Sequence, residues 1–264
     1  MPESIGPLLA CLDLEDVGEG RFRARHHDTG RGVVFGGQVL SQIVVAASRS
    51  VPDKSVLSLH NVFSRAVSID EPLDLRVEVA HAGRSFATAT VTTSQGDRTC
   101  TEAVVLLHAP DDDLIRHADD APEWSRPEVV GDRDGSWEVH ADGDVSDPAA
   151  VGPPELRVWT RFGGAPDDPV VAQALLAYAS DGFLIGTAMR PHEGIGQSMA
   201  HVSVATTVLA QTITFHEPFR ASGWLLLDQR STYAGRGRSH GVATVFDEEG
   251  HLVASFTQDN MIRR

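Results

Sequence analysis

A carboxylate stands at the end of an apolar helical pattern in residues 170–182. Four apolar residues of this segment recur at the spacing of one helix face, namely Val171, Ala174, Leu175 and Tyr178. The next position on that face is Asp181, and a buried carboxylate is costly unless polar partners surround it. Alternatively, the helix has already ended, so that Asp181 and Gly182 form a surface turn. The segment alone supports both interpretations equally.

Two other polar side chains continue apolar strand faces elsewhere in the chain. The apolar face of the last predicted strand ends at Gln258, and a buried amide needs hydrogen-bond partners. The alternative is that this strand has reached its exposed end. Thr206 shares a predicted strand face with Val202, Val204 and Val208, which would direct its hydroxyl into the same interior.

Asp181, Thr206 and Gln258 would thus place a carboxylate, a hydroxyl and an amide on interior faces of one half of the chain. A carboxylate can act as a general base toward a water molecule, and a hydroxyl and an amide can hold both in line. The sequence offers no nucleophile paired with a histidine that would indicate a covalent route. These residue types therefore favour attack by an activated water.

The elements that must position these residues occur in the same order twice. The first half has a strand-like entry at 21–27, a helix within 33–52, and strands at 55–65, 73–81, 85–93 and 98–109. The second half has a strand at 155–162, the helix that leads to Asp181, and strands at 202–215, 224–233, 239–246 and 251–262. A helix followed by antiparallel strands predicts the α+β class.

Matching turns support an internal duplication. Residues 82–84 and 234–236 both read AGR, and the turns at 95–97 and 248–250 each precede a long final strand. Counted from those turns, Val104 corresponds to Gln258. We expect each half to be a helix wrapped by an antiparallel sheet, with the two sheets side by side around one core.

The connection between the two halves is strongly acidic. Between residues 111 and 150 there are thirteen Asp or Glu against three Arg, and the segment is rich in Pro and Gly. We expect an N-terminal unit at 1–118, a solvated linker at 119–151 with anchors at Trp124 and Trp137, and a C-terminal unit at 152–264 that carries the site.

Bulk composition excludes several classes of function. A net charge of −15 over 264 residues argues against general binding to nucleic acid. We find no apolar run long enough to span a membrane, no signal peptide, and no His or Cys spacing typical of a metal site. Cys11 and Cys100 are the only cysteines, so we expect a reduced, cytoplasmic protein without a metal or cofactor.

Motifs spread over nearly the whole chain resemble those of the acyl-CoA thioesterase II family, in the expected order. They are VFGGQV at 34–39, HAGRSF at 81–86, YASD at 178–181 with Pro191-His192 downstream, FHEPF at 215–219 and VASFTQ at 253–258. The resemblance implies a double hotdog fold, in which two helix-wrapped antiparallel sheets join into one continuous sheet. It also implies hydrolysis of acyl-CoA by an Asp, a Thr or Ser, and a Gln that bind and activate water.

The resemblance assigns the carboxylate to Asp181 and the amide to Gln258, whereas the hydroxyl has more than one match. The D-H-S-type segment that follows the hydroxyl residue in the family is absent from residues 205–212. Matching from the upstream side gives Thr206, with Thr207 as the second choice. Matching from Phe215 gives instead a valine, Val208, so we take Thr206 as the predicted residue.

We therefore expect an acyl-CoA thioesterase of fatty acid metabolism that releases a free fatty acid and CoA. The altered segment at 205–212 motivates the alternative of a non-catalytic hotdog protein that binds acyl-CoA or an acyl carrier. Arg84, Arg236 and Arg238 are candidate contacts for the CoA phosphates, or else surface arginines in turns. Because exposed sheet edges need covering, we also expect a homo-oligomer.

Overall fold

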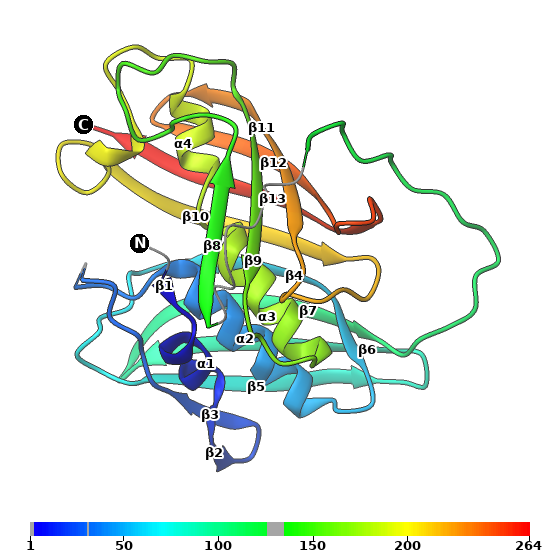
Figure 1. Cartoon of the computed structure of the whole chain (residues 1–264). Coiled ribbons are helices and arrows are strands. Elements are labelled where there is room, and N and C mark those ends of the chain that lie inside the picture. The colour runs from blue at the N-terminus through cyan, green and yellow to red at the C-terminus, as the bar shows by residue number, and fades with distance from the viewer. Residues whose placement is uncertain (1–2, 31, 126–134) are drawn as a thin grey trace.

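The computed structural model describes residues 3–30, 32–125 and 135–264, which form one continuous antiparallel sheet with helices packed against it (Figure 1). Within these residues the sheet has thirteen strands in the order β1-β8-β9-β11-β12-β13-β10-β4-β7-β6-β5-β3-β2. The strands are β1 (Glu3–Ser4), β2 (Glu15–Gly18), β3 (Arg21–Ala24), β4 (Ser55–Phe63), β5 (Leu73–Ala82), β6 (Phe86–Gln95), β7 (Arg98–His108), β8 (Ser136–Ala141), β9 (Glu155–Phe162), β10 (Ala205–Phe215), β11 (Leu225–Gly235), β12 (Arg238–Phe246) and β13 (Leu252–Arg263). The helices are α1 (Gly6–Leu12), α2 (Gly36–Ser50), α3 (Pro169–Ser180), α4 (Leu184–Met189) and the short 3₁₀ helix η1 (Gln197–Met199).

The two halves of the sheet meet at two neighbouring strands, β10 and β4. Outward from β10 lie β13, β12, β11 and β9, and outward from β4 lie β7, β6, β5 and β3. Each half therefore repeats one long helix and five strands, with α2 equivalent to α3. The predicted α+β double hotdog is confirmed, including the joining of the two sheets into one.

The two long helices pack side by side and run in opposite directions (Figure 1). Asp168 begins α3 by accepting the Val171 N–H at 2.9 Å, and Pro169 follows at a position where no amide hydrogen is needed. The Ser41 hydroxyl of α2 donates to the Ala174 carbonyl oxygen at 2.7 Å. Residues 174–180 are all buried: α3 packs on α2, and Trp137 of β8 and Phe162 of β9 contact its Tyr178. The burial of α3 is thus wider than the predicted single stripe.

Three segments for which no helix or strand is predicted contain secondary structure, and one of them, between α3 and β10, contains α4 and η1. Part of the segment 119–151 is β8, which pairs with β9, while residues 126–134 lie outside the described residues. Trp137 lies in β8 and stacks on Phe162 with 5.7 Å between ring centroids, and Trp124 stacks on Trp159. Both tryptophans are therefore anchored to the second half.

Residues 3–20, which precede the first predicted strand, also fold. They form α1, which packs on α2, and β1, which crosses over to pair with β8. The strand β1 thus forms the edge of the sheet beside the second half. The unit boundaries at residues 118 and 152 stay a prediction.

One helical stretch in the described residues has the length and composition of a membrane span. It is Pro169–Met189, in which a window of 18 residues has a mean hydropathy of 1.3 and is 67% buried inside the protein. A buried core helix passes the same test, so this stretch is weak evidence for a membrane span.

The two cysteines are free and buried, and burial raises the pKa of the Cys11 thiol to about 11.

Candidate active site

Asp181 is the residue at which α3 ends, and its side chain faces the interior. The last helical residue is Ser180, and Asp181 caps the helix with φ −79° and ψ −10°. Asp181 is only 9% exposed. The helix thus ends one residue before Asp181, as the turn interpretation expects. The carboxylate of Asp181 is nevertheless buried, as the helix-face interpretation expects.

The buried carboxylate lies against the N-terminus of α2. The Gly37 backbone N–H donates to Asp181 Oδ2 at 3.0 Å. The positive end of the α2 dipole therefore offsets the unfavourable place of Asp181 at the negative end of α3. A Cβ added to Gly36 would lie 2.9 Å from that same oxygen, and one added to Gly37 would lie 2.3 Å from the Tyr178 carbonyl oxygen. The two glycines of VFGGQV allow this close approach.

A chain of buried hydrogen bonds links the end of α3 to β13. Gln258 donates through Nε2 to Asp181 Oδ1 at 3.4 Å and to Gln211 Oε1 at 2.9 Å. Gln211 lies on β10 and donates through its own Nε2 to the hydroxyl oxygen of Ser180. That hydroxyl donates to the Ala177 carbonyl oxygen at 2.9 Å. The predicted residues Asp181 and Gln258 are therefore in contact, and Gln211 is a further member that the sequence analysis does not identify.

Thr206 and Asp181 line one cavity of about 550 Å³ beside the start of α2. Thr206 is 4% exposed, whereas Thr207 is exposed and donates to the Val208 carbonyl oxygen at 3.3 Å. Among the described residues, no hydrogen bond joins the Thr206 hydroxyl to Asp181 or Gln258. The structure therefore brings Asp181 and Thr206 to a common cavity, while Gln258 is fully buried and contacts Asp181.

The strand face predicted for Thr206 is only partly correct. Val204 and Val208 are buried like Thr206, but Val202 is 84% exposed and precedes β10. A β-bulge between Val208 and Ala210 then changes which residues face the interior. Downstream of that bulge the buried positions are Gln211, Ile213 and Phe215.

The position equivalent to Gln258 in the first half is Ala103, and the predicted match to Val104 is wrong. Gln211 lies opposite Gln258, and Asn61, its direct partner across the two central strands, lies opposite Ala103. Ala103 is 1% exposed, whereas Val104 is 53% exposed on the other face of the sheet. The count from the turn fails because the two turns differ in length: residues 96–97 lie between the paired Gln95 and Arg98, whereas residues 247–251 lie between the paired Phe246 and Leu252.

The two halves of the fold differ at the positions of Asp181 and Gln258. Among the described residues, the second half has these two polar side chains and the first half has apolar ones. The residue that caps α2 is Val51, in the place that Asp181 takes at the end of α3. Val51 and Ala103 are both buried and apolar. The duplicated fold therefore has an Asp–Gln pair in its second half and a Val–Ala pair in its first.

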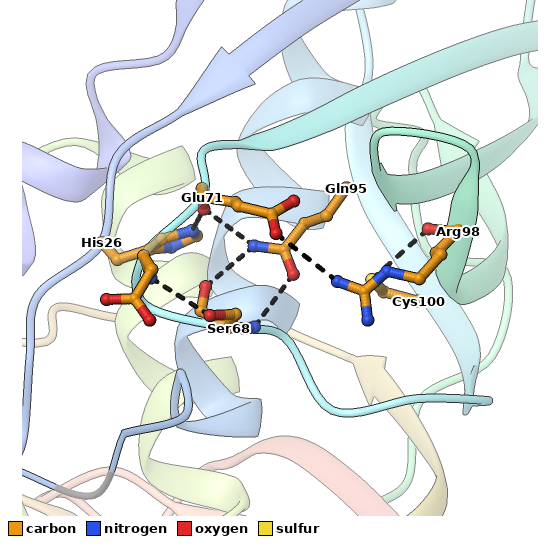
Figure 2. Close-up of polar contacts among 7 residues, drawn as sticks. His26, Ser68, Glu71, Gln95, Arg98 and Cys100 are labelled. Atoms are coloured by element: carbon orange, nitrogen blue, oxygen red, sulfur yellow. Dashed lines mark hydrogen bonds and ion pairs between the residues drawn. The ribbon is translucent and has the colours of Figure 1, made fainter.

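A second buried amide fixes the segment beside this cavity. Figure 2 shows Gln95 between the backbone groups of Ser68 and Glu71. Gln95 Nε2 donates to the Ser68 carbonyl oxygen at 2.8 Å and to the Glu71 carbonyl oxygen at 2.7 Å, while Oε1 accepts the Ser68 N–H at 2.9 Å. Residues 64–67, immediately before this segment, line the cavity. Gln95 therefore supports the cavity wall through backbone contacts.

His26 belongs to the same set of contacts (Figure 2). Its Nε2 donates to the Glu71 carbonyl oxygen at 2.9 Å, and its Nδ1 lies 3.3 Å from Gln38 Nε2, from which it can accept. Burial lowers the pKa of His26, and the hydrogen bond to the Glu71 backbone offsets part of this effect. The folded protein therefore favours the neutral imidazole.

We expect His26 to make stability depend on pH. As the pH falls below the ordinary histidine pKa of about 6.5, the unfolded chain binds a proton at His26 before the folded protein does, so the free energy of unfolding decreases. Urea denaturation at about pH 7.5 and about pH 5.5 should show a larger loss for the wild type than for His26→Gln. Equal losses in the two proteins would contradict this assignment.

One group of possible metal ligands comes together in the described residues, in the turn before β13. Side-chain atoms of Asp247, Glu249 and His251 lie within 4.8 Å of one another. Asp247 Oδ1 accepts the backbone N–H groups of Glu249 and His251 at 3.1 and 2.8 Å. The Asp247 carboxylate thus stabilises the turn, which is far in sequence from Asp181 and Thr206.

Comparisons with known proteins agree with this architecture. Residues 23–108 match the family model described as the acyl-CoA thioesterase N-terminal domain, and residues 110–262 match the acyl-CoA thioesterase C-terminal domain. The chain is 29% identical to acyl-CoA thioesterase 2 of Haemophilus influenzae, over 100% of this chain and 99% of that protein.

Two solved structures from mycobacteria are also similar. A tesB protein of Mycobacterium avium subspecies paratuberculosis has a TM-score of 0.84 and 27% identity, covering 99% of this chain and 100% of that one. The acyl-CoA thioesterase II TesB2 of Mycobacterium marinum has a TM-score of 0.81 and 30% identity, covering 97% of this chain and 98% of that one.

Proposed function

Because the chain belongs to the acyl-CoA thioesterase family, we propose that it hydrolyses an acyl-CoA thioester to a free fatty acid and CoA through Asp181, Thr206 and Gln258. One observation carries the assignment of roles. Asp181 is a buried carboxylate on the wall of a cavity, held by a helix N–H and by the amide of Gln258. A carboxylate fixed in this way is suited to act as a general base.

In this proposal Asp181 removes a proton from a water molecule as the water oxygen bonds to the thioester carbonyl carbon. The C–S bond then breaks, and the sulfur leaves with its electron pair. The proton held by Asp181 passes to the departing sulfur, which regenerates the carboxylate. Gln258 positions the water and the carboxylate, and the Thr206 hydroxyl supports both, so that the attack requires little reorganisation.

The lining of the cavity supports an amphipathic substrate. Its apolar wall would take the acyl chain, and it includes Val34, Phe35, Phe63, Ile185 and Leu209. Arg65 and His201 also line it and are our candidates for contact with CoA phosphates. The sequence analysis named three other arginines as candidate contacts for the CoA phosphates, and none of them is among the described residues that line this cavity. They are Arg84, Arg236 and Arg238.

We expect the two neighbouring threonines to behave differently. Thr206→Val removes the buried hydroxyl while keeping the shape of the side chain, and should lower kcat about tenfold, the effect of losing one hydrogen bond of about 1.4 kcal/mol. Thr207→Val is the matched control and should leave kcat within about twofold, because its hydroxyl contacts its own strand. A larger loss in Thr207→Val would assign the hydroxyl role to Thr207.

A panel of acyl-CoA thioesters of increasing chain length, read out by release of free thiol, tests the activity. Turnover on at least one chain length supports the enzyme. The altered segment at 205–212 still motivates the alternative of a binding protein. Tight acyl-CoA binding with no thiol release at any chain length would favour that alternative and contradict our proposal. A cytoplasmic location, a homo-oligomeric assembly and a role in lipid metabolism stay predictions.

A further inference from the structure

Gln211 is a fully interior amide that the proposed mechanism does not use. It lies on β10 just after the β-bulge, directly opposite Gln258 on β13. Gln211 is buried, and its hydrogen-bond connection to the Asp181 carboxylate runs through Gln258. Its two amide atoms are both engaged, with Ser180 on one side and Gln258 on the other.

The hydrogen bonds around Gln211 have a fixed direction. The Ala177 carbonyl oxygen can only accept, so the Ser180 hydroxyl donates to it and presents a lone pair to Gln211. Gln211 must then donate to Ser180 through Nε2, which turns Oε1 toward Gln258. Gln258 must in turn present Nε2 to that oxygen. The backbone of α3 therefore decides the orientation of the Gln258 amide.

The orientation of Gln258 matters because its two ends are chemically opposite. As oriented, Nε2 donates to the Asp181 carboxylate, and Oε1 has no hydrogen-bond partner among the described residues. Turning the amide over would place Oε1 against the Asp181 carboxylate and Gln211 Oε1, both of which can only accept. In that orientation acceptor oxygens would face one another, and Nε2 would lose both of its acceptors, so the hydrogen bonds through Gln211 favour the orientation described above.

We propose that Gln211 is a positioning residue, which holds the amide of Gln258 with Nε2 toward Asp181 and Oε1 available to accept a hydrogen bond from the attacking water. This inference rests on the proposed function. It also gives the unusual segment at 205–212 a role, because the bulge within it brings Gln211 to the interior face. The first half of the fold has no such need, since Ala103 stands where Gln258 would be.

A double-mutant cycle tests this role. Gln211→Met keeps the length of the side chain and removes both hydrogen bonds, and should lower kcat about tenfold while KM changes less than about twofold. In a Gln258→Met background the same substitution should change kcat less than about twofold, because there is no amide left to orient. Single-turnover rates with enzyme in excess extend the measurement to slow variants.

The matched control is Gln173→Met. Gln173 is a partly buried amide on α3 whose Nε2 donates to the Val56 carbonyl oxygen at 2.8 Å. It should lose some stability and keep its kcat, which separates orientation of Gln258 from general loss of a buried hydrogen bond. Each variant is assayed well below its own melting temperature, so that the comparison concerns folded protein.

Three results would overturn the inference. They are an unchanged kcat in Gln211→Met, an equal loss of kcat in the wild-type and Gln258→Met backgrounds, or an equal loss in Gln173→Met. Failure of the proposed function is a different result, since it would appear as an unchanged kcat in Gln258→Met itself.

Discussion

Replacing Asp181 with asparagine should lower kcat by about 10²–10⁴-fold, the usual contribution of a general base. The change preserves size, and the amide oxygen of the new side chain can still accept the Gly37 N–H, which lies 3.0 Å from the native carboxylate. It removes the negative charge and with it the capacity to take a proton from water. We expect the dissociation constant for acyl-CoA to change less than about threefold, because the acyl chain and CoA would contact other residues.

The control for this substitution lies at the other end of the same helix. Asp168→Asn also removes one carboxylate, but Asp168 caps the N-terminus of α3 through the Val171 N–H, a role that asparagine performs equally well. We expect its kcat and stability to match those of the wild type. A kcat in Asp181→Asn within about threefold of the wild-type value would remove Asp181 from the mechanism.

Gly37→Ala should reduce both stability and activity. The new Cβ would meet the carbonyl oxygen of Tyr178 at 2.3 Å and its carbonyl carbon at 3.0 Å, and these are backbone atoms of a buried helix. The helices α2 and α3 must therefore move apart, which we expect to lower the free energy of unfolding by about 1–3 kcal/mol. Since the Asp181 carboxylate is held between these two helices, kcat should fall as well.

Gly36→Ala separates the two effects. Its Cβ would meet the Asp181 Oδ2 atom at 2.9 Å and the Phe63 Cζ atom at 3.3 Å, which are side-chain atoms that can shift. We expect a smaller loss of stability than in Gly37→Ala together with a clear loss of kcat. Gly6→Ala is the control, because its nearest neighbour is an ordinary contact at 3.7 Å. Urea denaturation and thiol release measure both quantities, and a Gly37→Ala protein as stable as Gly6→Ala would contradict the packing described here.

Much of the fold can be predicted from the alternation of residues and from the internal repeat. Every strand longer than six residues is anticipated, and β9 has the predicted bounds. The elements that are missed are short or depend on distant partners. For example, β8 lies in an acidic segment, and its residues become a strand because β9 and β1 offer edges to pair with. No local pattern records that pairing.

The site follows from the sequence only in part. Gln258 continues an apolar strand face, and the structure puts that face in the interior. Counting back from Phe215 through Ile213 would place Gln211 on the interior face. Counting forward from Thr206 does not, because the β-bulge between Val208 and Ala210 shifts the alternation by one residue. Bulges and register shifts move a whole face by one residue, and they are set by tertiary pairing.

The contact between Asp181 and Gly37 is the other feature that sequence cannot supply. The two residues are 144 positions apart, and their meeting depends on the antiparallel packing of α2 and α3. The family motif makes both residues noticeable, but only the fold explains the glycine. It allows a helix N-terminus to compensate a carboxylate that its own helix would disfavour.

The most direct test of direct attack by water is a single-turnover experiment with enzyme in excess over acyl-CoA, in which free thiol and free fatty acid are measured together. If water activated by Asp181 attacks the thioester, both products should appear with one rate constant, and Asp181→Asn should slow both by the same factor. Thiol released ahead of the acid, with the protein mass raised by one acyl group, would show a covalent acyl-enzyme and contradict the mechanism proposed here.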